Sequence, residues 1–266
     1  PINIKQYCVL KKKFILYKGI CIRVMKKCII FCPQGLGDWV MVNPIVRILS
    51  KKYERVALIY NSYSAEFLPN MFKDLENVQL EYNCQSGLPD IDVIGPYYKE
   101  RGYECIDLIS CLGKYVDHTF VIDMENLNQP YNRAMYSTAG FDWYRDGKEY
   151  YIPIDDDESE RFHKSLNLPD EYIFLHEGIH PKIDRSHIIN KNLPIFEPYY
   201  IHNVFLYKHT IENAKEIHVV ASGIYNFADK LNFKTNNFFM HGTRTPLLDS
   251  PYLNPILNKP WKMINY

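Results

Sequence analysis

Asp38 follows two closely spaced glycines in the stretch Gly35-Leu36-Gly37-Asp38, and this arrangement could support chemistry. An apolar run at 28–32 precedes the stretch, and apolar residues recur every three or four positions after it. The pattern predicts a strand, a glycine-containing turn and a helix start, where free backbone N–H groups can bind an anion or a sugar. The Asp38 carboxylate could take a proton from an attacking hydroxyl group, although local chemistry favours a helix cap.

A second junction of this kind occurs late in the chain, where Ser222 and Gly223 follow a buried strand predicted at 216–220. Serine is a good cap for the helix expected to begin there. The free N–H groups at 222–224 could equally bind a phosphate. The local sequence supports the two interpretations about evenly.

Two groups of polar residues resemble metal ligands at first sight. Three consecutive aspartates occupy 155–157, and His176 and His180 flank Glu177. The aspartates fit the first turn of a helix, whose dipole acidic side chains complement. The histidines belong to a loop that contains Gly178 and Pro181, without a third ligand at suitable spacing. We therefore predict a helix cap at 155–157, the polar rim of a binding cleft at 176–180, and no metal site.

Composition excludes several functional classes. The chain of 266 residues has 31 basic and 31 acidic residues, which argues against a broad nucleic-acid or membrane-binding surface. Its seven cysteines form an odd, scattered set, as expected of reduced, buried thiols in a cytoplasmic protein. Val40 stands where a dinucleotide fingerprint would have its third small residue, so no nicotinamide cofactor, and no other cofactor, is expected.

The elements that must position these residues alternate between strands and helices, which predicts parallel α/β architecture. In a first unit we expect strands at 28–32, 55–60, 78–82, 91–95 and 118–123, and further helices at 65–75 and 128–140. After a linker that begins at 141, a second unit should have strands at 172–176, 216–220 and 237–242, and helices at 157–166, 203–214 and 222–231. We expect the segment 177–202 to be a long irregular loop.

The predicted fold is two Rossmann-like domains facing a central cleft, an acceptor-side domain at 25–150 and a donor-binding domain at 151–266. Residues 1–24 are expected to lie outside the folded unit as an extension. Lysine and arginine interrupt every apolar run there, so no transmembrane segment is predicted. A small-residue cleavage site is also lacking, so no signal peptide is predicted.

Three segments together resemble the heptosyltransferase-like glycosyltransferases of family 9. "FCPQGLGDWVMVNPIVRILSKKYERVALI" (31–59) is similar to the family's opening strand, Gly-Leu-Gly-Asp turn and proline-containing helix. "YIFLHEGIHPKIDR" (172–185) is similar to the strand and basic residue that open its donor domain. "IENAKEIHVVASGIYNFADKL" (211–231) is similar to its late helix, strand and Ser-Gly helix start.

The resemblance implies a GT-B fold and an inverting, metal-independent transfer of a sugar from a nucleotide-sugar donor to a hydroxyl group of a glycan or lipid-linked saccharide. It implies that Asp38 is the catalytic base. It also implies that donor or acceptor is bound by the glycine turns, by cations beside the diphosphate and by an acidic residue near the ribose: Gly35, Gly37, Lys182, Arg185, Glu212, Ser222 and Gly223. Because Ala221 replaces the family's aspartate before Ser-Gly, the alternative is a catalytically inactive nucleotide- or sugar-binding module with the same fold.

Overall fold

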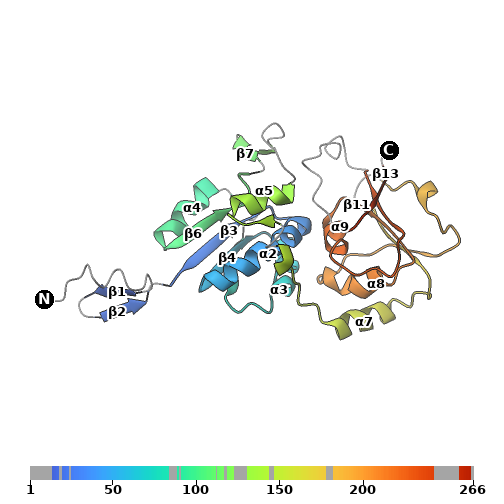
Figure 1. Ribbon diagram of the computed structural model, residues 1–266, viewed down its shortest axis with the longest axis horizontal. Helices are drawn as coiled ribbons and strands as arrows, with labels where there is room; N and C mark the ends of the chain where they lie inside the picture. Colours follow the sequence, from blue (N-terminus) through green and yellow to red (C-terminus); the bar gives the residue numbers. More distant parts are fainter. Residues whose placement is uncertain are drawn as a thin grey trace.

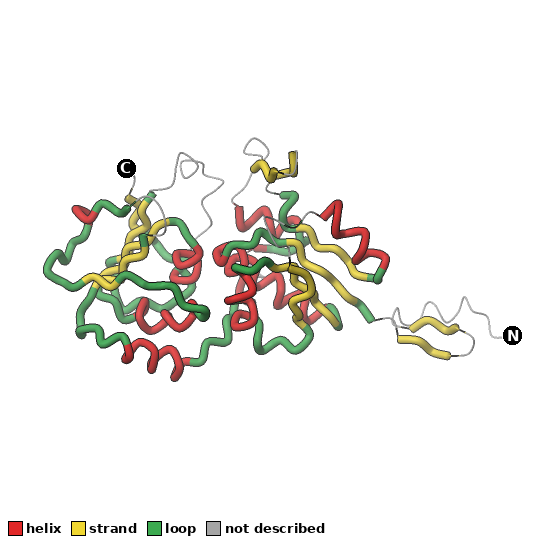
Figure 2. Tube along the Cα trace, turned by 180° about the vertical axis from the view of Figure 1, so that it is seen from behind, coloured by secondary structure: helices red, strands yellow, loops and turns green. Residues whose placement is uncertain are grey.

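Two α/β units lie side by side in the computed structural model of the chain (Figure 1). The structure describes residues 14–17, 20–23, 25–83, 89, 91–111, 113–116, 119–122, 131–143, 147–177, 182–242 and 258–264. Near the N-terminus, β1 (Phe14–Tyr17) and β2 (Ile20–Arg23) pair with each other as an antiparallel hairpin. Figures 1 and 2 both show this hairpin apart from the two units.

The first unit contains a four-stranded parallel sheet in the order β5-β4-β3-β6. Numbered along the chain, this is the order 3-2-1-4 of half a Rossmann fold. The strands are β3 (Lys27–Phe31), β4 (Arg55–Tyr60), β5 (Val78–Asn83) and β6 (Tyr103–Asp107). The helices are α2 (Leu36–Lys52), the 3-10 turn η1 (Ser64–Glu66), α3 (Leu68–Met71), α4 (Ile91–Glu100) and α5 (Tyr131–Thr138).

The second unit contains a five-stranded parallel sheet in the order β10-β9-β11-β12-β13, which is 2-1-3-4-5 along the chain. Its strands are β9 (Ile173–His176), β10 (Ile195–Phe196), β11 (Glu216–Val220), β12 (Phe238–His241) and β13 (Lys262–Ile264). Its helices are α7 (Asp156–Ser165), η3 (Arg185–His187), η4 (Val204–Tyr207), α8 (Lys208–Glu212) and α9 (Gly223–Ala228), and η2 (Gly147–Glu149) precedes it. The expected fold of two Rossmann-like domains is therefore confirmed.

Several elements differ from the sequence prediction. The expected strand at 91–95 is wrong, because Ile91, Ile94 and Tyr98 recur at helical spacing and pack α4 against the first sheet. The helix expected at 65–75 is reduced to η1 and α3. The sequence prediction also missed β6, β10 and β13. The strand expected at 118–123 corresponds to β8 (Thr119–Ile122), which pairs with β7 (Gly113–Val116) in a separate antiparallel hairpin.

Both faces of the central strands β3, β4, β9 and β11 are buried, as is typical of parallel sheets. Cys28, Ile30 and Cys32 face one core, whereas Ile29 and Phe31 face another that α4 covers. The first of these cores continues into the second unit, where it includes Phe174 on β9 and residues of α9. One apolar core therefore spans both units and favours a fixed relation between them.

The connection between the units packs against α2 through Arg47. The Arg47 Nε donates to the carbonyl oxygen of Tyr151 at 2.6 Å, and the guanidinium lies 4.8 Å from the centre of the Tyr151 ring. Nη1 and Nη2 form a bidentate pair with Asp74 at 2.8 and 3.0 Å. These contacts hold the linker beside α2, while the domain limits at 24/25 and 150/151 stay predictions.

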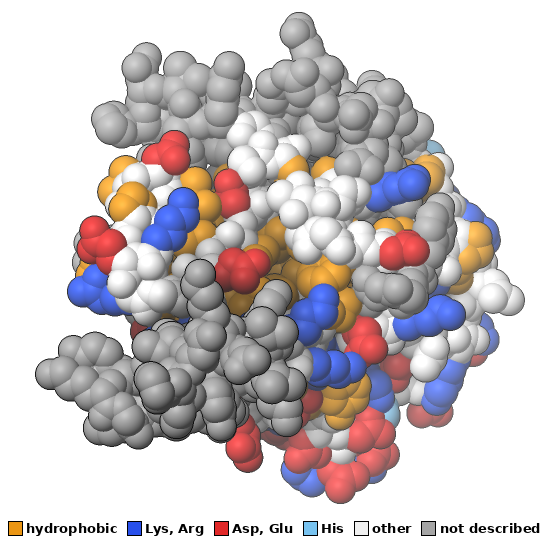
Figure 3. Space-filling view, turned by 60° about the vertical axis from the view of Figure 1, so that its left-hand side comes forward, with side chains coloured by type: hydrophobic (Ala, Val, Ile, Leu, Met, Phe, Trp, Pro, Cys, Tyr) orange, Lys and Arg blue, Asp and Glu red, His pale blue; other side chains and the backbone are white. Residues whose placement is uncertain are grey.

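The surface has mixed charge. On the face drawn in Figure 3, basic and acidic side chains lie close to one another among apolar ones, as expected from 31 residues of each sign. None of the helices in the described part of the chain combines the length and the apolar character needed to cross a bilayer.

Candidate active site

The carboxyl edges of the two sheets contain the places where ligands bind in open α/β folds. Such ligands occupy the switch point, where neighbouring strands lead to connections on opposite sides of the sheet. In the first sheet this point lies between β3 and β6, and the loop Cys32-Pro33-Gln34 leaves it for α2. In the second sheet it lies between β9 and β11, which end at His176 and Val220.

The start of α2 orients Asp38. Gly35 is the N-cap residue and Asp38 is the third residue of the helix, so the expectation that Asp38 itself caps the helix is corrected. Its carboxylate turns back, and Oδ2 accepts the backbone N–H of Gly35 at 3.0 Å. The helix begins earlier than the sequence suggested because this bond satisfies an otherwise unpaired donor before the first turn. Asp38 is partly exposed as a residue.

The first turn of α2 contacts the first turn of α9 across the two units. A methyl group on Gly223 would lie 2.6 Å from the Cβ of Leu36, and one on Gly37 would lie 2.5 Å from the Nδ2 of Asn226. Both glycines therefore allow close helix contact, a role that the sequence analysis did not assign to them. This contact brings the two carboxyl edges, and with them Asp38 and Ser222, to the same part of the molecule.

Ser222 forms the cap of α9, as one of its two interpretations predicted. Its Oγ accepts the N–H of Tyr225 at 3.4 Å and lies 3.3 Å from the Nδ1 of His176. His176 is the last residue of β9, so the hydrogen bond connects the ends of the two strands that form the switch point.

The side chains of Lys182 and Arg185 lie within ion-pair distance of the buried carboxylate of Glu177. Lys182 Nζ donates to Glu177 Oε2 at 2.7 Å, and the backbone N–H of Ile183 donates to Oε1 at 3.2 Å. The hydrogen bond to Glu177 raises the pKa of the Lys182 ammonium group. Arg185 lies 3.9 Å from Glu177 and 2.6 Å from Glu197. The side chains of Lys182 and Arg185 are 79% and 52% exposed, so both cations reach solvent beside the end of β9.

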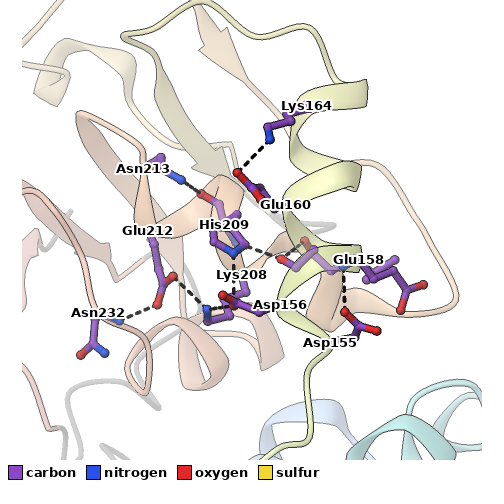
Figure 4. A network of polar contacts seen from close by, with 12 residues as sticks. Asp155, Asp156, Glu158, Glu160, Lys164, Lys208, His209, Glu212, Asn213 and Asn232 are labelled. Carbon is purple, nitrogen blue, oxygen red and sulfur yellow. Dashed lines mark hydrogen bonds and ion pairs between the residues drawn. The ribbon is translucent and has the colours of Figure 1, made fainter.

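Glu212 lies away from these residues. It ends α8, before the amino end of β11, whereas Ser222 follows the carboxyl end of that strand. Its carboxylate accepts the N–H of Asn232 at 3.0 Å and lies 3.5 Å from Lys208 Nζ, within the polar network of Figure 4. The structure therefore does not bring Glu212 together with the other predicted site residues.

Asp155 and Asp156, the first two of the three aspartates, belong to the same distant network. Asp155 is the N-cap of α7 and accepts the N–H of Glu158 at 2.9 Å, which confirms the predicted cap. Asp156 pairs with Lys208 and His209 of α8 (Figure 4). Among the residues that the structure describes, no three His, Cys, Asp or Glu side chains are grouped as metal ligands would be. His180 lies outside the described residues.

A fully buried chain of hydrogen bonds supports the segment that contains Lys182 and Arg185. Glu216 accepts the N–H groups of Ile189 and Asn190 at 2.7 and 3.0 Å. His218 Nε2 donates to Glu216 at 2.7 Å, and because a neutral ring has one acceptor nitrogen, its Nδ1 accepts from His241 Nε2 at 2.8 Å. Burial and then the nearby His218 and His187 lower the pKa of His241 to about 4.

This chain predicts a loss of stability in mild acid. The folded pKa of His241 lies below its ordinary value of 6.5, so the unfolded state binds the proton more strongly. Stability is retained above pH 6.5 and falls as the pH decreases toward 4, by about 2 kcal/mol at pH 5 from this group. Thermal unfolding measured from pH 7 to 5 should show the decrease. It should be reduced in His241→Asn but not in His202→Gln, which alters an exposed histidine.

The arrangement of the two sheets is that of the GT-B class of glycosyltransferases. The structure of the E. coli ADP-heptose lps heptosyltransferase II matches 90% of this chain and 90% of its own, at 11% identity and a TM-score of 0.54. A family 9 glycosyl transferase from Veillonella parvula matches 91% of this chain and 86% of its own, at 9% identity and a TM-score of 0.52. Neither a family model nor a curated protein sequence matches the chain. The similarity at these identities establishes a shared fold.

Sequence reasoning missed Glu177 and Asn226 at the site, and the exposed Tyr63 in the loop after β4. Glu177 appeared only as part of a polar rim, although Gly178 and Pro181 indicated a turn that could return Lys182 to it. Asn226, which contacts Gly37, lies one helical turn after Ser222 and gave no signal by itself. Tyr63 was hidden among 22 tyrosines, although Asn61-Ser-Tyr-Ser64 after β4 is typical of a side-chain-stabilised turn.

Proposed function

We propose that this protein is an inverting, metal-independent glycosyltransferase that moves a sugar from a nucleotide-sugar donor to an acceptor hydroxyl group. The observation that supports the proposal is the contact of α2 and α9 through Leu36 and Gly223. Through this contact the Asp38 carboxylate, at the switch point of the first sheet, lies in the same part of the molecule as the start of α9, which Ser222 caps at the switch point of the second sheet. The proposed setting is glycan biosynthesis in the cytoplasm.

The proposed reaction starts at Asp38. Its carboxylate takes the proton of the acceptor hydroxyl group while the acceptor oxygen attacks the anomeric carbon of the donor. The bond from that carbon to the diphosphate breaks, and the diphosphate leaves with the electron pair. The Gly35 N–H holds the carboxylate in one orientation, which is the protein's contribution to positioning the base.

The diphosphate would be stabilised from the second unit. Lys182 uses one of its three donors on Glu177, and Arg185 is held by the exposed Glu197. An exposed ion pair contributes little to stability, so Arg185 can exchange Glu197 for phosphate oxygens at small cost. The N–H groups at the start of α9 add to this positive environment. Since one structure of similar fold is named for ADP-heptose, ADP and ADP-heptose are the first ligands to test.

Removing either cation should weaken diphosphate binding. In Lys182→Ala and in Arg185→Ala we expect the Kd of the bound nucleoside diphosphate to rise about tenfold, because a charge-assisted hydrogen bond is lost. Calorimetric titration measures the change. Lys191→Ala is the matched control, since Lys191 is an exposed lysine of the same segment. An equal Kd in all four proteins would remove both cations from the donor site.

A thermal-shift screen of the whole chain against nucleoside diphosphates, nucleotide sugars and NAD tests the proposed class. A ligand that binds only the native state raises the melting temperature. The proposal predicts that one nucleoside diphosphate and its sugar conjugate do so. A shift with NAD alone would contradict it. A shift without any turnover of the nucleotide sugar would instead indicate a binding module of the same fold.

A further inference from the structure

Two exposed tyrosines, one from each unit, lie near each other, and Tyr63 is also near the proposed catalytic base, Asp38. Tyr63 precedes η1 in the loop after β4 and is 50% exposed. Tyr200 belongs to the extended segment between β10 and η4 and is 64% exposed. The mechanism above uses neither residue. We call Tyr63 and Tyr200 the tyrosine pair.

The loop that contains Tyr63 is fixed to the loop that leads to Asp38. Ser64 Oγ donates to Gln34 Oε1 at 2.9 Å, and Gln34 Nε2 donates to the carbonyl oxygen of Cys32 at 2.7 Å. The backbone N–H of Ser64 donates to Asn61 Oδ1 at 2.8 Å, which closes the turn locally. The position of Tyr63 is therefore set by buried polar contacts, while half of its side chain remains accessible.

Glu66 joins the tyrosine pair across the two units. The Tyr200 hydroxyl group donates to Glu66, which lies three residues after Tyr63. Burial raises the pKa of Tyr63, and the charges of Glu66 and then Asp38 raise it further. The pKa of Tyr200 is raised chiefly by its hydrogen bond to Glu66, and slightly by Tyr63. Tyr63 therefore lies within electrostatic reach of Glu66, Asp38 and Tyr200.

This combination fits a carbohydrate. The faces of a pyranose ring carry C–H groups that pack on aromatic rings, and its rim carries hydroxyl groups that donate to carboxylates. We propose that the tyrosine pair, with Glu66, forms a subsite for a pyranose ring of the acceptor and presents its hydroxyl group to Asp38. The inference rests on the proposed function, in which Asp38 is the base. It identifies the acceptor as a sugar that enters between Tyr63 of one unit and Tyr200 of the other.

The test measures saccharide binding without catalysis. Methyl glycosides of glucose, galactose, mannose and N-acetylglucosamine, in both anomeric forms, are titrated into the whole chain and followed by saturation-transfer NMR. We expect at least one to bind, and its Kd to rise about tenfold in Tyr63→Ala and in Tyr200→Ala. Tyr63→Phe and Tyr200→Phe, which keep the rings, should bind nearly as well as the unaltered chain.

Tyr97→Ala, which removes an exposed tyrosine on α4, is the control and should leave binding unchanged. The inference is overturned if none of the glycosides binds the unaltered chain, or if both alanine variants bind as well as it does. Titration of ADP into the same samples separates this inference from the proposed function. Glycoside binding through the tyrosines without any nucleotide binding would retain the subsite and reject the transferase. Nucleotide binding without any glycoside binding would reject the subsite alone.

Discussion

Replacing Asp38 by asparagine should lower the rate of sugar transfer by about 10²–10⁴-fold, the usual contribution of a general base. The amide cannot take up the proton, yet its oxygen can still accept the Gly35 N–H, so the start of α2 should be preserved. The Kd of the nucleoside diphosphate should be unchanged, because the proposed donor site belongs to the other unit. Steady-state kinetics and calorimetry on the same protein measure the two effects.

Asp157→Asn is the matched control for this substitution. Asp157 is an exposed carboxylate in the first turn of α7, so its replacement alters a helix start of the same kind away from the site. It should transfer sugar at the full rate. Unchanged turnover in Asp38→Asn, with donor binding intact, would assign Asp38 to helix stabilisation only.

Replacing Gly223 by alanine should separate the two units locally and reduce both stability and transfer. The added methyl group would lie 2.6 Å from Leu36 Cβ and 2.8 Å from Leu36 Cγ, and a Cβ atom cannot rotate away. Overpacking of this kind costs about 1–3 kcal/mol. The shift should also misplace Ser222 relative to Asp38, which lowers the rate further. Chemical denaturation and kinetics measure the two losses.

A reciprocal substitution tests whether contact with Leu36 causes the loss of stability in Gly223→Ala. Leu36→Gly removes the atoms that the new methyl group would meet, so it should relieve part of the damage in the Gly223→Ala background. In a double-mutant cycle the two changes should therefore show a coupling of about 0.5–3 kcal/mol. Strictly additive effects would mean that the close approach of α2 and α9 does not determine the stability of this contact.

Strong local patterns in the sequence predicted the central elements well. The predicted strands at 55–60 and 216–220 match β4 and β11 to the residue. In β4 the continuous apolar run at 56–59 is typical of a buried parallel strand, whereas β11 also contains the polar residues Glu216 and His218. The segment 91–95 misled because Ile91 and Val93 fit the alternation of a strand, whereas Ile91 and Ile94 fit one face of a helix equally well. The edge strands β10 and β13, of two and three residues, are too short for any periodicity to show.

The site was less accessible from sequence, because its geometry depends on contacts between distant segments. The glycine spacing correctly marked the starts of α2 and α9, yet only the fold shows that Gly223 packs on Leu36. Likewise, the charge of Lys182 was evident, while its partner Glu177 was not. Glu212 illustrates the opposite error. Its place in a motif suggested a ligand contact, but α8 ends at the amino edge of the sheet.

The measurement that tests the central claim most directly is NMR analysis of the transfer reaction. The whole chain is incubated with the nucleotide sugar that it binds and a mixture of saccharide acceptors, with and without EDTA. The account predicts equal amounts of nucleoside diphosphate and of a glycoside whose anomeric configuration is inverted, formed at the same rate in both samples and absent with Asp38→Asn. A glycoside of retained configuration, or no nucleoside diphosphate from a donor that binds, would contradict it.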